Sequence, residues 1–89
     1  MKKYFLENSI QYKNEEGEII AEIDFPKTGE NEITITHTFV SPILRGQGIA
    51  KELIEQVILY AKENNLKIKA TCSYAVSYFE KNQSDLYIK

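Results

Sequence analysis

The feature that most constrains the fold of this chain is a change of hydrophobic period between residues 41 and 48. Before this stretch, apolar residues alternate with polar ones, which is the two-residue period of a half-buried β-strand. After it, apolar residues recur every three or four positions, which is the period of an amphipathic helix. The segment between the two patterns, SPILRGQG, must therefore connect a strand to a helix.

Three strand patterns precede the change. In EIIAEIDF (residues 18–25), one face carries the apolar side chains of Ile19, Ala21, Ile23 and Phe25. The segment before it predicts a partner strand with a hairpin turn at Asn14 to Gly17. After a second turn at PKTGEN, the run EITITHTFV (residues 32–40) alternates again and is rich in β-branched residues. We expect these strands to form an antiparallel meander.

The helical pattern extends from Gly48 to Asn64, and Asn64 or Asn65 can end the helix in a left-handed conformation. Its apolar stripe consists of Ile49, Ala50, Leu53, Ile54, Val57, Ile58 and Ala61. A short strand at 66–72 and a second helix at 74–82 follow. The order β-β-β-α-β-α predicts the α+β class, with one main helix packed on a mostly antiparallel sheet.

Length and composition indicate a single domain over residues 1–89, with 43% hydrophobic and 27% charged residues. A net charge of -2 does not favour a nucleic-acid partner. The single cysteine forms no internal disulfide, and no segment has the apolar length of a signal peptide or a membrane span. We therefore expect a cytoplasmic monomer or weak homodimer with no membrane partner.

The sequence Arg45-Gly46-Gln47-Gly48, here called the glycine turn, lies where the strand pattern gives way to the helix. Glycine permits positive φ and lets a ligand approach the backbone closely. The unpaired N–H groups of the first helical turn then favour an anion such as pyrophosphate, and Arg45 and Lys51 add positive charge. The alternative is a glycine-rich loop that simply starts a helix.

Arg45-x-x-Gly48-x-Ala50 resembles the Arg/Gln-x-x-Gly-x-Gly/Ala signature of the GNAT acetyltransferase superfamily, and AVSYFEKN (residues 75–82) resembles a second segment of that superfamily. The resemblance implies a GNAT-like fold that binds acetyl-CoA and acetylates a small-molecule or protein amine. It also implies that the backbone of residues 45–50 holds the pyrophosphate of the cofactor. The expected cofactor-binding residues are Val40, Arg45, Gly46, Gln47, Gly48, Ile49, Ala50, Cys72, Tyr78 and Lys81.

The His37-Thr38 pair and the Cys72-Ser73-Tyr74 turn resemble a family of very short GNAT-like proteins, which makes Cys72, His37 and Tyr74 the candidate catalytic residues. The chain departs from larger members because it has no room for the elements that build their acceptor pocket. It also has Phe79 where many members place a proton-donating tyrosine. The neighbouring Tyr78 lies about 100° away around a helix.

Each candidate has a structural alternative. A helix N-terminus favours a reactive Cys72 thiolate, but most free cysteines are buried apolar groups. His37 is a candidate general base. Alternation nevertheless places it on the apolar face with Ile33 and Ile35, which favours a core histidine unless a β-bulge turns it outward. Tyr74 is either a hydroxyl donor or a packing group.

Two further features of the sequence concern its acidic residues and its potential metal ligands. The acidic residues Glu15, Glu16, Glu18 and Glu22 indicate a solvated hairpin face, with attraction of a cationic acceptor as the alternative. We predict no metal site, because one histidine and one cysteine in separate elements do not form a ligand cluster. The function that follows is an acetyl-CoA-dependent N-acetyltransferase, and the alternative is a non-catalytic module that binds acetyl-CoA or CoA.

Overall fold

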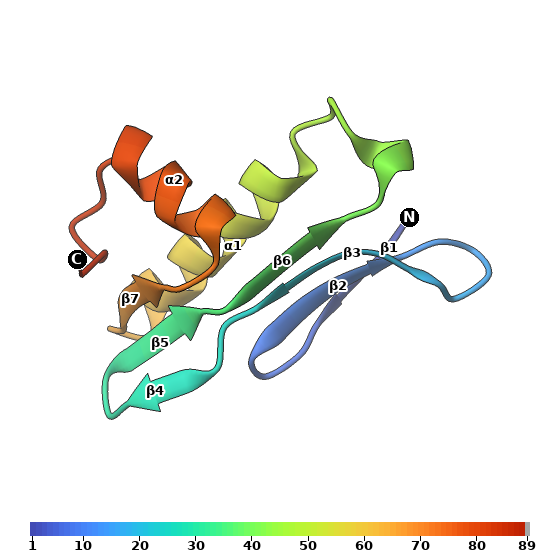
Figure 1. Ribbon diagram of the computed structural model, residues 1–89. Helices are drawn as coiled ribbons and strands as arrows, with labels where there is room; N and C mark the ends of the chain where they lie inside the picture. The colour runs from blue at the N-terminus through green and yellow to red at the C-terminus, as the bar shows by residue number, and fades with distance from the viewer. Residues whose placement is uncertain (89) are drawn as a thin grey trace.

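The computed structural model describes residues 1–88 as two small sheets and two helices (Figure 1). The elements are β1 (Lys2–Phe5), β2 (Ser9–Lys13), β3 (Ile19–Asp24), β4 (Lys27–Gly29), β5 (Glu32–Ile35), β6 (His37–Val40), α1 (Ile49–Glu63), β7 (Lys67–Ala70) and α2 (Ser73–Lys81). The four-stranded sheet is antiparallel with the order β1-β2-β3-β6. In the second sheet, β5 pairs with β4 antiparallel and with β7 parallel. The predicted α+β class and mostly antiparallel sheet are confirmed.

The predicted hairpin turn joins β2 to β3. The backbone carbonyl of Asn14 accepts a hydrogen bond from the N–H of Gly17 at 3.1 Å. The side-chain oxygen of Asn14 accepts the N–H groups of Glu16 and Glu18, each at 2.9 Å. Gly17 has a φ of 84°, in the left-handed region that favours glycine. Asn14 and Gly17 therefore close the turn in the way their residue types predict.

The predicted alternation is wrong at the start of β3. It places Ile19 on the core face, but Ile19 is 40% exposed and Ile20 is buried in its place. Tyr12 of β2 pairs with Ala21, whereas the next residue, Lys13, pairs with Ile19. Ile20 is thus an extra residue in β3, and such a bulge exchanges the two faces of the strand.

The run at 32–40 predicts one strand, but the structure divides it at Thr36 into β5 and β6, which belong to different sheets. Thr36 donates its backbone N–H to the carbonyl of Asp24 at 3.0 Å. The next residue, His37, also lies opposite Asp24 in the ladder between β3 and β6. Two consecutive residues opposite one residue of the partner strand form a β-bulge.

This bulge decides which side chains of the run reach the core. Ile33 and Ile35 are fully buried, as alternation predicts, but His37 is exposed and Phe39 is 39% exposed. The interpretation of His37 as a core histidine is therefore wrong. The extra residue at Thr36 turns the imidazole outward, which is the alternative that the sequence left open.

The strands β1 and β4 have no counterpart in the predicted order. All four residues of β1 are exposed, so no buried side chains alternate along it. The strand β4 has three exposed residues and lies inside the segment predicted as a turn. Both strands exist because their backbones pair with β2 and β5, respectively. Such pairing leaves no hydrophobic pattern in the sequence.

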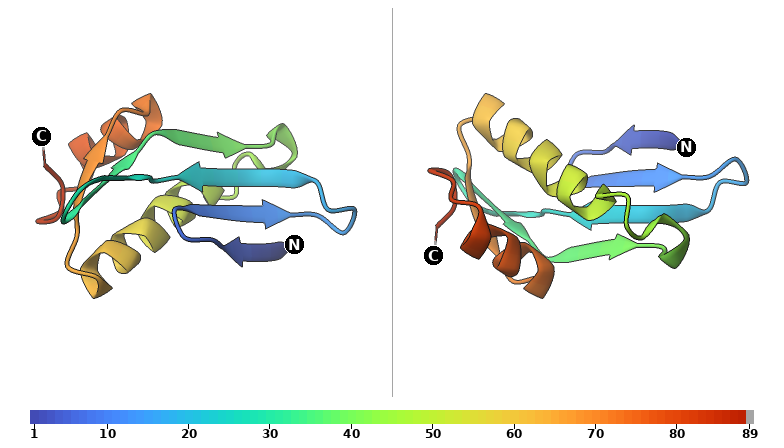
Figure 2. Two further views of the ribbon diagram at one scale, coloured as in Figure 1. Left: turned by 90° about the horizontal axis from the view of Figure 1, so that it is seen from below. Right: turned by 90° about the horizontal axis from the view of Figure 1, so that it is seen from above.

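The helix α1 begins directly after Gly48 and ends at Glu63, and Asn65 takes the predicted left-handed conformation with a φ of 56°. Its predicted apolar stripe faces the core. Ile49, Leu53, Ile54, Val57 and Ala61 are buried, while Ala50 and Ile58 are half-buried. Both helices lie on one side of the strands in Figures 1 and 2, so the opposite face of the four-stranded sheet carries no helix.

A buried tyrosine connects the N-terminal strands to α1. Tyr12 is fully buried, and its hydroxyl donates to Oε1 of Glu52 at 3.1 Å. Lys3 donates its Nζ to the same oxygen at 2.9 Å. Burial and then the negative charge of Glu52 raise the pKa of Tyr12 to about 12. The hydrogen bond from Lys3 is the main cause that lowers the pKa of Glu52, and burial opposes it.

We expect Tyr12→Phe to lower the free energy of unfolding by about 1 kcal/mol, because it removes one hydrogen bond from a partly buried carboxylate. Urea denaturation followed by circular dichroism measures the change. Tyr4→Phe is the matched control, since Tyr4 is 40% exposed and its hydroxyl makes no hydrogen bond within residues 1–88. Equal losses in the two variants would contradict the role given to the Tyr12 hydroxyl.

Candidate active site

The glycine turn connects β6 to α1, as the change of hydrophobic period predicts. A short 3₁₀ helix, Pro42–Leu44, precedes it. Gly46 and Gly48 have φ values of 83° and 72°. Apart from the glycine itself and its two chain neighbours, no heavy atom of the described chain lies within 4 Å of the point where a Cβ would stand at either glycine. The backbone conformation therefore favours glycine, and the space beside it is open to a ligand.

A groove of about 210 Å³ runs along the glycine turn and the start of α1. Six of the predicted cofactor-binding residues line it, namely Val40, Arg45, Gly46, Gly48, Ile49 and Ala50, together with Leu44 and Tyr74. Gln47 does not line the groove. No side chain caps the N-terminus of α1, so its first N–H groups and the positive end of its dipole remain available to an anion.

A second hollow of about 190 Å³ adjoins the groove, since Tyr74 lines both. The predicted residues Tyr78 and Lys81 line this hollow, and Lys51 adds a second ammonium group. Burial, and then the charges of Glu55 and Tyr74, raise the pKa of Tyr78. Together the two hollows contain every predicted cofactor-binding residue except Gln47 and Cys72.

A larger hollow lies elsewhere on the described chain. It measures about 470 Å³ and is lined by the outer part of α2 and the residues that follow, including Phe79, Glu80 and Tyr87. None of the predicted site residues lines it. It shares no lining residue with the two smaller hollows and includes no residue of the glycine turn. The volume of a hollow therefore does not by itself identify the site.

The strand β7 leaves the sheet just before Cys72. Its last pair with β5 joins Ala70 to Ile35, and the backbone N–H of Cys72 still donates to the Ile35 carbonyl at 3.2 Å. Beyond that point β6 pairs with β3 on one side and with no described strand on the other (Figure 1). We call this unpaired side of His37–Val40 the open edge.

The open edge presents backbone N–H groups. Ser41 donates its N–H to Ile20 of β3 at 2.8 Å. Because successive N–H groups along a strand point in opposite directions, those of Val40 and Thr38 point to the open edge. The N–H of Thr38 is one of the groups that stabilise the thiolate form of Cys72, which agrees with this direction.

Cys72 is half-buried at the N-cap of α2, and its Sγ lies 3.5 Å from Oγ1 of Thr38. Burial is the largest single effect on its pKa and raises it. Hydrogen bonds from the hydroxyl of Thr38 and from the backbone N–H groups of Ala75, Tyr74 and Thr38 outweigh burial, so the pKa of Cys72 is lowered. Cys72 thus packs against the hydrophobic core on one side and receives hydrogen bonds that favour its thiolate on the other.

The aromatic residues of α2 have different surroundings. Phe79 is buried and stacks on Tyr87 with ring centroids 4.2 Å apart. Its position therefore offers no hydroxyl, and it lines the 470 Å³ hollow but neither of the two smaller ones. Tyr74 is 44% exposed and lies at the junction of the two hollows, where its hydroxyl is accessible.

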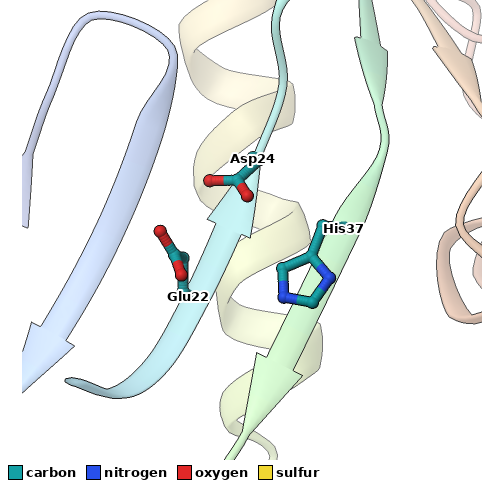
Figure 3. A group of neighbouring side chains, drawn as sticks. All are labelled: Glu22, Asp24 and His37. Atoms are coloured by element: carbon teal, nitrogen blue, oxygen red, sulfur yellow. The ribbon is translucent and has the colours of Figure 1, made fainter.

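His37 lies on the face of the sheet that carries no helix, beside Glu22 and Asp24 of β3 (Figure 3). The neighbouring Thr38 faces the other way and contacts Cys72. The structure therefore brings Cys72 and Tyr74 together at the start of α2 and places His37 across β6 from them. No pattern in the sequence places Glu22 and Asp24 beside His37, since only the register of β3 against β6 brings them there.

Residues 9–87 match the sequence profile of the family described as GCN5-related N-acetyl-transferase. The chain belongs to this family. Acetyl-CoA is the acetyl donor of GCN5-related N-acetyltransferases, and a relative from Bacillus anthracis was solved in complex with it. That structure, of a protein assigned as a streptothricin acetyltransferase, is 26% identical to this chain. It has a TM-score of 0.63 and covers 85% of this chain and 47% of its own.

A more similar family member is a GCN5-like protein of Staphylococcus aureus with an NMR solution structure. It is 42% identical, with a TM-score of 0.83 over 98% of this chain and 87% of that one. NATD1 of Xenopus tropicalis is 33% identical over 61 residues, which are 68% of this chain and 56% of NATD1. The match thus spans just over half the length of the curated relatives. No helix within residues 1–88 has the length and apolarity to cross a bilayer.

The lowered pKa of Cys72 makes its alkylation a direct test of the site. Because the thiolate is the reactive form, we expect the alkylation rate of Cys72 to reach half its maximum at a lower pH than that of a free cysteine measured under the same conditions. Thr38→Val should move the midpoint upward, whereas Thr38→Ser should retain it. Mass spectrometry after iodoacetamide treatment measures the rate at the single cysteine. A wild-type midpoint at or above that of free cysteine would contradict the assignment.

Proposed function

We propose that this chain transfers the acetyl group of acetyl-CoA to the nitrogen of an amine. The observation that carries the proposal is the uncapped start of α1 at Gly46 and Gly48, where open space lies beside left-handed backbone. The groove at this point extends to Val40 at the open edge and to Tyr74 on α2. Membership of the family supports acetyl-CoA as the ligand of this groove.

The chain binds the pyrophosphate through the backbone N–H groups of Gly46, Gly48, Ile49 and Ala50, with Arg45 adding positive charge. The N–H groups of Arg45 and Gln47 in the same stretch donate instead to the carbonyls of Pro42 and Leu44. The second hollow then receives another part of the same ligand. Lys51 and Lys81 line that hollow and suit a phosphate group, while Tyr78 contributes a neutral hydroxyl. In this proposal most of the binding uses backbone groups, which depend on the path of the chain more than on side-chain identity.

The acetyl group lies at the open edge beside Cys72. The N–H groups of Thr38 and Val40 point there and polarise the thioester carbonyl. Cys72 positions the acetyl group from the other side of the opening, since its Sγ contacts Thr38. Attack of the amine on the carbonyl carbon forms the C–N bond and breaks the C–S bond, within a complex that holds both substrates.

Two proton transfers accompany this attack. His37 takes, through solvent water, the proton that an ammonium acceptor must lose, because its exposed imidazole lies on the helix-free face, across β6 from Cys72. Tyr74 donates a proton to the departing CoA thiolate, because Phe79 has no hydroxyl and Tyr74 lies at the junction of the two hollows. The acceptor is a small-molecule or protein amine.

One observation favours a second candidate function. Phe79, at the position where many relatives use tyrosine, is buried and carries no acid–base group. A chain that binds acetyl-CoA and does not consume it would have the same groove and no need of a proton donor. Turnover with offered amines distinguishes this binding module from the enzyme.

Gly48→Ala tests the groove. The added Cβ strains left-handed backbone by about 1 kcal/mol and occupies the space proposed for the ligand. Gly17→Ala is the matched control, because Gly17 also has positive φ (84°) and open space but lies in the β2–β3 turn. We expect both variants to lose similar stability in urea. Only Gly48→Ala should weaken acetyl-CoA binding, measured by amide NMR titration. Equal affinities of the two variants for acetyl-CoA would contradict the proposed site.

Tyr74→Phe tests the proton donor. We expect kcat for CoA release to fall by about 100-fold with an accepted amine, while the affinity for acetyl-CoA stays within about twofold. Tyr60→Phe is the control, because Tyr60 lies on α1 against the ring of Phe25 and lines neither hollow. A screen of amines in which bound acetyl-CoA is never consumed would support the non-catalytic module instead.

A further inference from the structure

Three potential metal ligands meet on the helix-free face of the four-stranded sheet. Glu22 and Asp24 lie two residues apart on β3, so their side chains share one face, and His37 pairs with Asp24 from β6. One ligand atom of each residue lies within 4.8 Å of the others, and all three side chains point away from α1 (Figure 3). We call these three residues the carboxylate–histidine cluster.

The backbone holds this cluster rigidly. β3 is an inner strand, paired with β2 on one side and β6 on the other. The bulge at Thr36 turns His37 to the same face as the carboxylates. The three Cβ atoms are therefore placed by the hydrogen bonds of the sheet and not by a flexible loop.

Polar groups of β2 orient both carboxylates. Ser9 donates its hydroxyl to Oδ1 of Asp24 at 2.9 Å, and Gln11 donates its amide to Oε2 of Glu22 at 3.0 Å. Ser9 also lies 3.4 Å from Oε2 of Glu22. In each carboxylate one oxygen is thus held by β2 and the other is left for a further partner. Ligating carboxylates in metal sites are supported in the same manner.

The cluster has no compensating positive side chain in the described part of the chain. The ion pairs within residues 1–88 are Lys3–Glu52 and Lys69–Glu32. Lys13, on the neighbouring strand, lies instead over the ring of Tyr4 at 4.9 Å. The imidazole of His37 makes no hydrogen bond to another residue of this range. Two adjacent carboxylates and a histidine with unused nitrogens remain for a cation.

We propose that Glu22, Asp24 and His37 bind a divalent transition-metal ion of the zinc class. An imidazole ligand favours Zn²⁺, Co²⁺ or Ni²⁺ over Mg²⁺ and Ca²⁺, which prefer oxygen ligands. In a tetrahedral zinc site the ligand atoms lie about 3.4 Å apart. Side-chain rotations that move the ligand atoms of Glu22, Asp24 and His37 by little more than an ångström therefore bring them to that spacing. The fourth position of the metal ion is left to water.

The proposal departs from the sequence-based prediction of no metal site, which considered histidine and cysteine only. It goes beyond the proposed acetyl transfer, and one consequence rests on that function. A metal ion bound to the imidazole nitrogen of His37 occupies the lone pair that, in the proposed reaction, accepts the proton lost by the ammonium acceptor. Zinc bound here therefore slows acetyl transfer, and removal of zinc by a chelator restores the rate.

The first experiment titrates the ligand-free wild-type protein with Zn²⁺, in the absence of acetyl-CoA, and follows the His37 imidazole and backbone amides by NMR. We expect saturable shifts centred on β3 and β6, with much weaker effects of Mg²⁺. His37→Ala and Asp24→Asn should each lower the affinity for Zn²⁺ by more than about 10-fold, and Ser9→Ala by about 10-fold through lost orientation of Asp24. Their amide spectra report whether the sheet stays folded.

Two control variants separate the cluster from other sources of zinc affinity. Glu16→Gln removes one exposed carboxylate of the hairpin turn and should leave the affinity unchanged. Cys72→Ser removes the single thiol, which also binds zinc, and should leave the NMR shifts at His37 unchanged. Zinc affinity that is lost in Cys72→Ser and retained in His37→Ala would overturn the proposal, as would equal affinities for Zn²⁺ and Mg²⁺ or no binding at millimolar Zn²⁺. None of these results depends on acetyl transfer.

Discussion

The carbonyl of Asp24 faces two consecutive residues, Thr36 and His37, and the rest of the architecture depends on that bulge. Before it, β5 pairs with β7 in the second sheet. After it, β6 pairs with β3 and leaves its other edge open beside Cys72. A regular strand through the same residues would bury the imidazole of His37 and point the N–H of Thr38 toward β3. One inserted residue thus creates both the open edge and the carboxylate–histidine cluster.

The two faces of β6 divide the chemistry proposed for the chain. The side with the helices has the groove, the start of α1 and the thiol of Cys72. The helix-free side has the titratable groups that an amine or a metal ion would meet first. Most of the groove is formed by backbone at the ends of β6 and α1. A short chain can build such a site because the ends of its secondary structure supply the hydrogen-bond donors.

Residues that are close in the sequence were the easiest to predict. The glycine turn, the start of α1 and six of the residues that line the groove follow from one stretch of the chain, where local backbone conformation decides the outcome. Ile19 and His37 were predicted on the wrong face because a bulge adds a residue without changing the alternation of residue types. The contact of Cys72 with Thr38 joins two elements separated by the whole of α1. The resemblance pointed to both residues but not to their distance.

The sequence by itself determined the α+β class, the position where strands give way to helix, and the need for glycine at residues 46 and 48. These properties depend on hydrophobic period and on the backbone freedom of individual residues, which contiguous residues express directly. Only the tertiary structure decided that β7 leaves β5 before Cys72 and that Glu22 and Asp24 meet His37. Both outcomes depend on strand register and on the bulge at Thr36. Register is set by hydrogen bonds and core packing between segments far apart in the chain, and no local pattern records it.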